Sequence, residues 1–386
     1  MKNYMIKLCR AFLYGENIAL DASADYEKLY SISSAHNLSA VLFCVINTAE
    51  NKADLPQAAL KRFENDFYEA VVRYDFQGGI IAEIGALCER EGIRHVFFKG
   101  AAIRDLYPTP QARVMGDVDI LLDPGSRAQF KKLLTENGFE CKNANGNVYG
   151  YTKDGLLTEA HTKIISGKIG THDLETAFEN AITHAEFDGA RGVLDNNYHF
   201  AYLIAHTAHH FWFYGAGVKL VLDLAAMLNA CDIDLDKVLG YLEPCALQDF
   251  AKVMLTVCHN WFGCGKDYGA DTAKTEQFLL DYGAFGNINR NKAAVITRKD
   301  MESGGKSGGT RLHLLLPSYE KMRNIPYIPF IDGRPYLLPA AWVWRICYNL
   351  RHRRAFMLSA TENIGTEETI SQAKREFAYF EEIGLL

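Results

Sequence analysis

Two aspartates, Asp117 and Asp119, lie one residue apart in the apolar run that closes the segment VFFKGAAIRDLYPTPQARVMGDVDILL at residues 96–122. Side chains alternate between the faces of an extended strand, so both aspartates are predicted to point one way while Val118 and Ile120 point the other. Two carboxylates in a half-buried strand repel each other, and one would be protonated unless a divalent cation sits between them. The pair therefore predicts a metal site, and Mg²⁺ is the cation that we expect.

The hydrophobic period divides the chain into three predicted regions. Residues 1–91 are predicted to be helical, because apolar residues recur at steps of three and four from Tyr26 onward. Residues 92–170 form a core in which strands and helices alternate, and residues 171–386 are predicted to be helical again from Asp173 onward. The predicted fold class is α+β, with a small mixed β-sheet core and helices, flanked by mainly helical N-terminal and C-terminal regions.

Within the predicted core, the order of elements is strand, helix, strand, helix and hairpin. The apolar segment 93–98 predicts the first strand, 101–107 the first helix and 118–123 the second strand. The second helix is predicted over 126–139, with Ser126 as its N-cap. The hairpin is predicted over 148–164, because Asp154 and Gly155 separate two alternating segments there.

Composition excludes several classes of protein. The chain has 386 residues, 48% of them hydrophobic, and a formal charge of −6, so bulk electrostatics do not indicate a nucleic-acid binder. A local basic segment around Arg345 and Arg351 leaves contact with RNA or a membrane surface open, although a solvated helix face explains it too. No apolar run is long enough to span a membrane, and we see no signal peptide. The nine scattered cysteines fit reduced thiols and a cytoplasmic protein.

Residues around the aspartates add the parts of a phosphate site. Gly100 lets the backbone approach a phosphate closely, and the first amides of the following helix favour an anion. Lys99 and Arg113 are candidates to contact phosphate, although a solvated lysine at a strand end explains Lys99 as well. Glu159 alternates on the later hairpin strand and is the candidate for a third carboxylate. These parts suit metal-assisted phosphoryl or nucleotidyl transfer.

The same positions resemble a known family. The pattern is KG, LYP, an arginine, the D-x-D strand, GF, and then an acid and a histidine on a later strand. It resembles the uncharacterised nucleotidyltransferase family within the polymerase β type superfamily. The superfamily signature places Gly-Gly or Gly-Ser at a helix start, which Gly100 matches in its first position, whereas Ala101 departs from the second. The resemblance continues into the helical half and the tail segment 339–350.

The resemblance implies a chemistry and a set of residues. It implies a nucleoside triphosphate donor, with ATP expected, Mg²⁺, and attack of an acceptor hydroxyl on the α-phosphate with release of pyrophosphate. The catalytic residues and metal ligands that it implies are Asp117, Asp119 and Glu159. The residues expected to contact the donor are Lys99, Gly100, Ala101, Arg113, His161 and Lys219. The acceptor is left open among a small molecule, a protein side chain and an RNA end.

Two alternatives compete with this interpretation. Ala101 and the weakly indicated third acid also suit a nucleotide-binding or sensing protein of the same fold that has little turnover. A metal-dependent hydrolase is the second alternative, because His206 and His210 are four residues apart and share a helix face. The same histidines could instead pack in a helical bundle, or line the acceptor side of a cleft beside Lys219 and Asp223.

Overall fold

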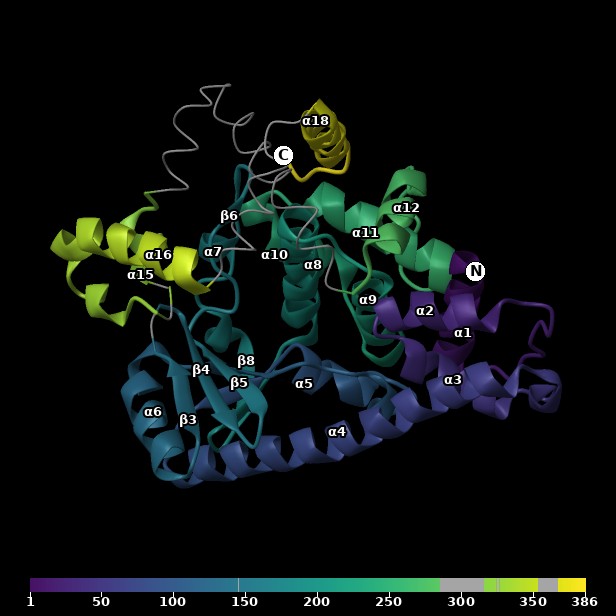
Figure 1. The fold of residues 1–386 in the computed structure, drawn as a ribbon, viewed down its shortest axis with the longest axis horizontal. Helices are drawn as coiled ribbons and strands as arrows, with labels where there is room; N and C mark the ends of the chain where they lie inside the picture. The colour runs from purple at the N-terminus through teal and green to yellow at the C-terminus, as the bar shows by residue number, and fades with distance from the viewer. Residues whose placement is uncertain (145, 285–315, 324, 326, 353–366) are drawn as a thin grey trace.

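The computed structural model shows a seven-stranded mixed sheet embedded among helices, and it confirms the predicted α+β class (Figure 1). It describes residues 1–144, 146–284, 316–323, 325, 327–352 and 367–386.

The N-terminal region is helical, as predicted. It consists of α1 (Lys2–Tyr14), α2 (Tyr26–Ala35), α3 (Ser39–Thr48) and α4 (Gln57–Arg90). With 34 residues, α4 runs along the length of the molecule below both the sheet and the helices (Figure 1). Its first half packs against α2 and α3, and its second half packs under the sheet. One helix therefore supports both parts of the structure.

The sheet has the strand order β3-β4-β5-β2-β1-β9-β8. At its centre β2 pairs parallel to β5 and antiparallel to β1, which in turn pairs parallel to β9. The strands are β1 (His95–Phe97), β2 (Val118–Leu122), β3 (Glu140–Asn143), β4 (Val148–Lys153), β5 (Leu156–His161), β8 (Ala185–Asp188) and β9 (Arg191–Leu194). A separate two-stranded sheet pairs β6 (Lys168–Ile169) with β7 (His172–Asp173).

The predicted hairpin is confirmed, and two other local predictions are corrected. Asp154 and Gly155 join β4 to β5 with φ of 50° and 82°, the left-handed values that such a turn requires. The expected helix at 101–107 is one α-helical turn, α5 (Gly100–Ile103), followed by a 3₁₀ turn. Ser126 precedes α6 (Arg127–Glu136), yet its side chain makes no capping bond, because it ends a 3₁₀ turn with helical dihedral angles.

The expectation that everything after Asp173 is helical is wrong for two strands. β8 and β9 form a hairpin that extends the sheet beyond β1. Each has four residues, and although burial alternates along both, so short a segment does not identify a strand from the sequence. Gly192 permits the pairing, because a Cβ there would lie 2.7 Å from the Phe187 ring and 2.9 Å from Val96. The division of the chain into three regions stays a prediction.

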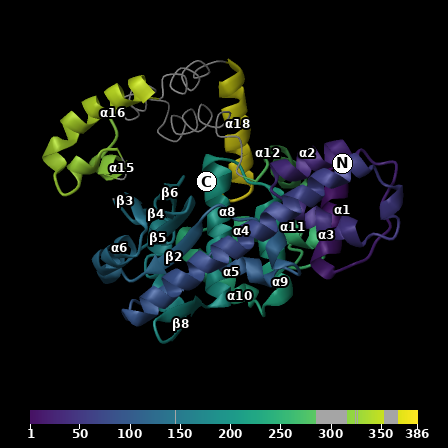
Figure 2. The ribbon, with the colours of Figure 1, turned by 60° about the horizontal axis from the view of Figure 1, so that its bottom comes forward.

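The remaining described helices lie on the side of the sheet opposite α4, and α11 and α12 among them lie beside the N-terminal helices (Figures 1 and 2). They are α7 (Leu174–Ala177), α8 (Asn196–Phe213), α9 (Val218–Ala230), α10 (Leu235–Leu242), α11 (Gln248–Phe262), α12 (Ala273–Tyr282), α15 (Tyr319–Arg323), α16 (Leu338–His352) and α18 (Glu367–Glu382). The break predicted at Gly215–Gly217 separates α8 from α9. Among these described helices, none combines the length and apolar character needed to cross a bilayer. All nine cysteines are unpaired.

Both faces of the central strands are covered. Val118, Ile120 and Leu122 join a core with α4 and α6. Val96, Phe98 and Leu121 join the larger core that includes α8, α9 and α11. Residues on the second face therefore look toward the helical half of the molecule, and this is the face on which the candidate site lies.

Candidate active site

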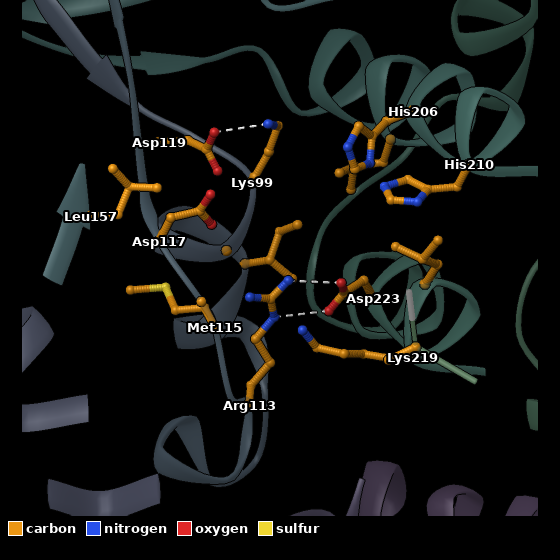
Figure 3. Close-up of a pocket in the computed structure, with 16 residues that line it drawn as sticks. Lys99, Arg113, Met115, Asp117, Asp119, Leu157, His206, His210, Lys219 and Asp223 are labelled. Atoms are coloured by element: carbon orange, nitrogen blue, oxygen red, sulfur yellow. Dashed lines mark hydrogen bonds and ion pairs between the residues drawn. The ribbon is translucent and has the colours of Figure 1, made fainter. Parts of the chain in front are cut away.

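Strand alternation places the two aspartates on one face, as predicted. Val118 and Ile120 pack toward α4 and α6, whereas Asp117 and Asp119 line a cavity on the opposite face (Figure 3). The cavity has a volume of about 470 Å³. Asp119 is 4% exposed, so its carboxylate lies at the base of the cavity.

The cavity has two walls of different origin. One wall comes from the sheet and the loops around β2, and it contributes Lys99, Gly100, Arg113, Asp117, Asp119 and Leu157. The other comes from α8 and α9, and it contributes Leu203, His206, His210, Lys219 and Asp223. Figure 3 shows the aspartates facing the histidines across this space. We call these the sheet wall and the helix wall.

Parallel pairing brings the third acid and its neighbouring histidine beside Asp119. The register pairs Asp119 with Glu159 and Leu121 with His161. His161 Nε2 lies 2.8 Å from Asp119 Oδ1 and 3.6 Å from Glu159 Oε2. One ligand atom from each of Asp119, Glu159 and His161 lies within 4.8 Å of the others, an arrangement that can hold a metal ion.

The carboxylates differ in their affinity for protons. Burial raises the pKa of Asp117, and the neighbouring charge of Asp119 raises it further. Burial and the charge of Asp117 raise the pKa of Glu159 in the same way. Burial would also raise the pKa of Asp119, but Lys99 and His161 outweigh it and lower that pKa to about 2. Carboxylates that raise one another's pKa offer the oxygen ligands and excess negative charge that suit Mg²⁺.

Lys99 is held against Asp119 in a strained backbone conformation. Its ammonium group donates to Asp119 Oδ1 at 2.8 Å, and its backbone N–H donates to His199 Nε2 at 3.3 Å. Burial would lower the pKa of Lys99, but Asp119 outweighs this effect and raises it. The residue has φ of 49° and ψ of −128°, a conformation that costs a non-glycine residue about 1–3 kcal/mol and is concentrated at functional sites.

Arg113 links the loop before β2 to α9. Its guanidinium donates to both oxygens of Asp223, at 3.0 Å and 2.8 Å, and the Tyr107 hydroxyl donates to the same carboxylate at 2.7 Å. Burial would raise the pKa of Asp223, but Arg113 outweighs it and the pKa is lowered. Arg113, which is predicted to contact phosphate, thus also connects the sheet wall to the helix wall through its ion pair with Asp223.

Gly100 is needed for this packing. A Cβ at Gly100 would lie 2.4 Å from Arg113 Nη1 and 3.1 Å from Met115. Arg113 is held by two bonds to Asp223, so it has little freedom to move aside. The absence of a side chain at position 100 therefore makes room for the arginine as well as for a ligand. Ala101 is 8% exposed and is not among the described residues that line the cavity.

The helix wall carries three basic side chains. Burial and the charge of Arg113 lower the pKa of Lys219 to about 7. Burial, followed by the charge of His209, lowers the pKa of His210 to about 4, and burial and His210 lower that of His206 well below its usual value. Within the described residues, clusters of three or more possible metal ligands include Asp119, Glu159 and His161 but not His206 or His210. This distribution does not favour a histidine metal centre on α8.

Sequence reasoning did not find every residue at the site. His199 accepts the Lys99 amide, and Tyr107 donates to Asp223, yet neither belongs to a recognisable motif. The four-residue spacing of His206 and His210 was the available signal for the helix wall. Contacts that join residues about 100 positions apart have no local sequence signal.

Residues 22–263 match the model of a family described as "Uncharacterised nucleotidyltransferase". The match spans the sheet, both walls of the cavity and the helices from α2 to α11, and it ends before the tail segment 339–350. No curated protein and no solved structure matches the chain.

Proposed function

The chain belongs to the uncharacterised nucleotidyltransferase family, and we propose that its cavity binds a nucleoside triphosphate with Mg²⁺. The nucleoside monophosphate is then transferred to an acceptor hydroxyl, and pyrophosphate is released. The observation that carries the proposal is that Asp117 and Asp119 line a cavity whose opposite wall carries basic side chains, while Glu159 lies within ligand distance of Asp119. ATP is the donor that we expect, and the cytoplasm is the expected location.

The three carboxylates would hold the metal. When bound, Mg²⁺ supplies positive charge that stabilises the attacking and leaving oxygens of the transfer. His161 orients Asp119 through its 2.8 Å contact. A carboxylate oxygen of the set that is not bound to the metal would accept the proton of the attacking hydroxyl.

The cationic residues would receive the donor's phosphates. Lys99 is paired with Asp119 in the free protein, and an incoming phosphate offers its ammonium group a second anionic partner. Arg113 on the sheet wall and Lys219 on the helix wall also line the cavity, where they would face the phosphate chain. The Arg113–Asp223 pair also fixes the distance between the walls, so it positions the donor relative to the carboxylates.

Donor binding tests this proposal. The free energy of binding of α,β-methylene ATP, which cannot release pyrophosphate, is measured by calorimetry with and without Mg²⁺. We expect binding to depend on Mg²⁺, and the double variant Asp117→Asn/Asp119→Asn to bind at least about tenfold more weakly. Asp123→Asn is the matched control, because Asp123 directly follows the same strand and does not line the cavity. Unchanged affinity and metal dependence in the double variant would contradict the proposal.

A nucleotide-binding protein without turnover is the second candidate. It is favoured by the Lys99–Asp119 ion pair, because an ammonium group already neutralises one of the expected metal ligands. The variant Glu159→Gln separates the candidates. Loss of pyrophosphate release with retained nucleotide binding supports the transferase, whereas nucleotide binding by the unmodified protein without pyrophosphate release across a broad set of acceptors supports the sensor.

A further inference from the structure

The helix wall carries three basic side chains to which the proposed role of the carboxylates assigns no function. His206 and His210 lie one turn apart on α8, with ring centroids 4.6 Å apart, and Lys219 projects from the start of α9. All three line the cavity and face the aspartates across it (Figure 3). The acid on this wall, Asp223, already accepts three hydrogen bonds from Arg113 and Tyr107.

One atom of this wall is buried and has no partner. Nδ1 of His210 makes no hydrogen bond within the described part of the chain. A buried polar group without a partner costs about 1–3 kcal/mol. His210 lines the cavity, so a rotation of its ring would let this atom bond to a ligand there. When the imidazole is protonated this atom can only donate, so an acceptor such as a phosphate oxygen would then complete it.

Burial, and then the charges of neighbouring bases, keep the helix wall largely neutral. The histidines face Lys99, His161, His209 and Lys219, all of them basic, and the rings of Tyr202 and Tyr214 pack beside them. Lys219 faces Arg113, Asp223 and Asp117. Burial in this setting lowers the pKa of His210 to about 4 and that of Lys219 to about 7. An anion placed between these groups would reverse the balance, because it favours their charged forms.

We propose that His206, His210 and Lys219 form a clamp for the polyphosphate chain of the donor, and that the clamp takes up protons as the chain binds. This inference rests on the proposed function, because it assigns the donor's phosphates to the helix wall of the same cavity. A chain of phosphates supplies several acceptors and negative charges at once, which matches three basic side chains from two adjacent helices. A neutral acceptor hydroxyl would leave these groups without counter-charge.

Proton uptake gives the clamp a pH signature. For each proton taken up on binding, affinity falls about tenfold per pH unit as pH rises, because the free protein must be protonated first. The effect is present above the low pKa values of the free clamp and below the raised values of the complex. Donor binding is therefore expected to tighten as the pH falls from 8 toward 6.

Inorganic tripolyphosphate without metal is the probe. Its binding is measured by calorimetry at pH 7.5 in two buffers with different enthalpies of ionisation, which counts the protons exchanged. We expect the intact protein to take up at least one more proton per ligand than His206→Gln/His210→Gln, and the double variant to bind at least about tenfold more weakly. Protonation of the ligand itself cancels in this comparison.

His209→Gln is the matched control. His209 lies on the same helix, but its ring packs on Phe213 and it does not line the cavity. We expect its proton uptake and affinity to stay close to those of the intact protein, because burial has a larger effect than the charge of His209 on the pKa of His210. Equal uptake and affinity in the double variant, or no tripolyphosphate binding by the folded protein, would overturn the clamp.

The result is separable from the proposed function. Tripolyphosphate has no nucleoside and cannot donate one, so its binding does not depend on nucleotidyl transfer. If transfer fails but the double variant loses proton uptake, the clamp stands and the transferase does not. If transfer occurs while the double variant binds tripolyphosphate as the intact protein does, the clamp alone is wrong. Circular dichroism confirms that each variant is folded.

Discussion

The two walls of the cavity differ in the ionisation of their buried side chains. On the sheet wall, Asp119 stays charged because Lys99 and His161 compensate it. On the helix wall, burial among other bases shifts Lys219 and His210 toward their neutral forms. The difference indicates what a matching ligand brings: a cation for the sheet wall and a polyanion for the helix wall. A nucleoside triphosphate bound to Mg²⁺ has both parts.

The largest expected effect comes from removing the Arg113–Asp223 ion pair that connects the two walls. Asp223→Ala leaves Arg113 charged and buried without its partner, so we expect the free energy of unfolding to fall by about 3–5 kcal/mol. Urea denaturation measures it. Asp249→Ala is the control, because Asp249 pairs with Lys252 on the surface and its loss is expected to cost less than about 1 kcal/mol. Equal losses in the free energy of unfolding of the two variants would show that the Arg113–Asp223 ion pair stabilises the fold no more than a surface pair does.

The next effect separates the charge of the sheet wall from its shape. Asp119→Asn keeps the side-chain volume but removes the negative charge that meets Lys99 and His161. We expect transfer, measured as pyrophosphate release, to fall by about 10²–10³-fold. A variant that retains more than half of the activity would remove Asp119 from the catalytic machinery.

The third prediction concerns the free energy of unfolding that the protein loses because Lys219 is buried in the helix wall. Burial lowers the pKa of Lys219 in the folded protein to about 7, whereas an unfolded lysine titrates at about 10.4. The unfolded chain therefore binds more protons between these values, and the stability of the intact protein rises with pH across that window.

Removing this lysine should therefore stabilise the fold while weakening the site. We expect Lys219→Met to raise the free energy of unfolding at pH 6 by about 1–3 kcal/mol, and this gain to shrink as pH rises from 7 to 10. Tripolyphosphate affinity should fall about tenfold in the same variant. Denaturation at several pH values checks the first part; a gain that does not change with pH would contradict the assigned burial of a charge.

The smallest effect concerns the fit between the walls. Gly100→Ala places a Cβ against Arg113 and Met115, and we expect a loss of about 1–2 kcal/mol in the free energy of unfolding. Gly125→Ala is the control, because a Cβ at Gly125 meets nothing within 4 Å. Equal stability of the two variants would show that Arg113 can shift at little cost.

The sheet wall was largely predictable from sequence, and the helix wall was not. Alternation in the strand 118–122 is a local rule, and it correctly placed Asp117 and Asp119 on one face. The Asp154–Gly155 turn predicted the hairpin that carries Glu159, whereas the parallel pairing that sets Glu159 beside Asp119 is seen only in the structure. These inferences needed only the period of a strand and the chemistry of a turn.

The remaining features depend on contacts that no local pattern records. Lys99 was expected at a strand end, yet its ion pair with Asp119 follows from the antiparallel pairing of β1 with β2. Arg113 and Asp223 are 110 residues apart in the sequence. The low pKa of Lys219 arises from burial between segments that meet only in the fold. The hydrophobic period of the sequence therefore identifies which residues share a face, and the tertiary structure determines which of their side chains stay ionised.

Transfer of label from the donor tests the central claim most directly. The protein is incubated with Mg²⁺, an extract of the cells that make it, and nucleoside triphosphates labelled on the α-phosphate. The account predicts that label becomes attached to an acceptor, that one pyrophosphate is released for each label transferred, and that Asp119→Asn abolishes both while Asp123→Asn does not. Equal labelling by Asp119→Asn, or bound nucleotide with no label on any acceptor, would contradict it.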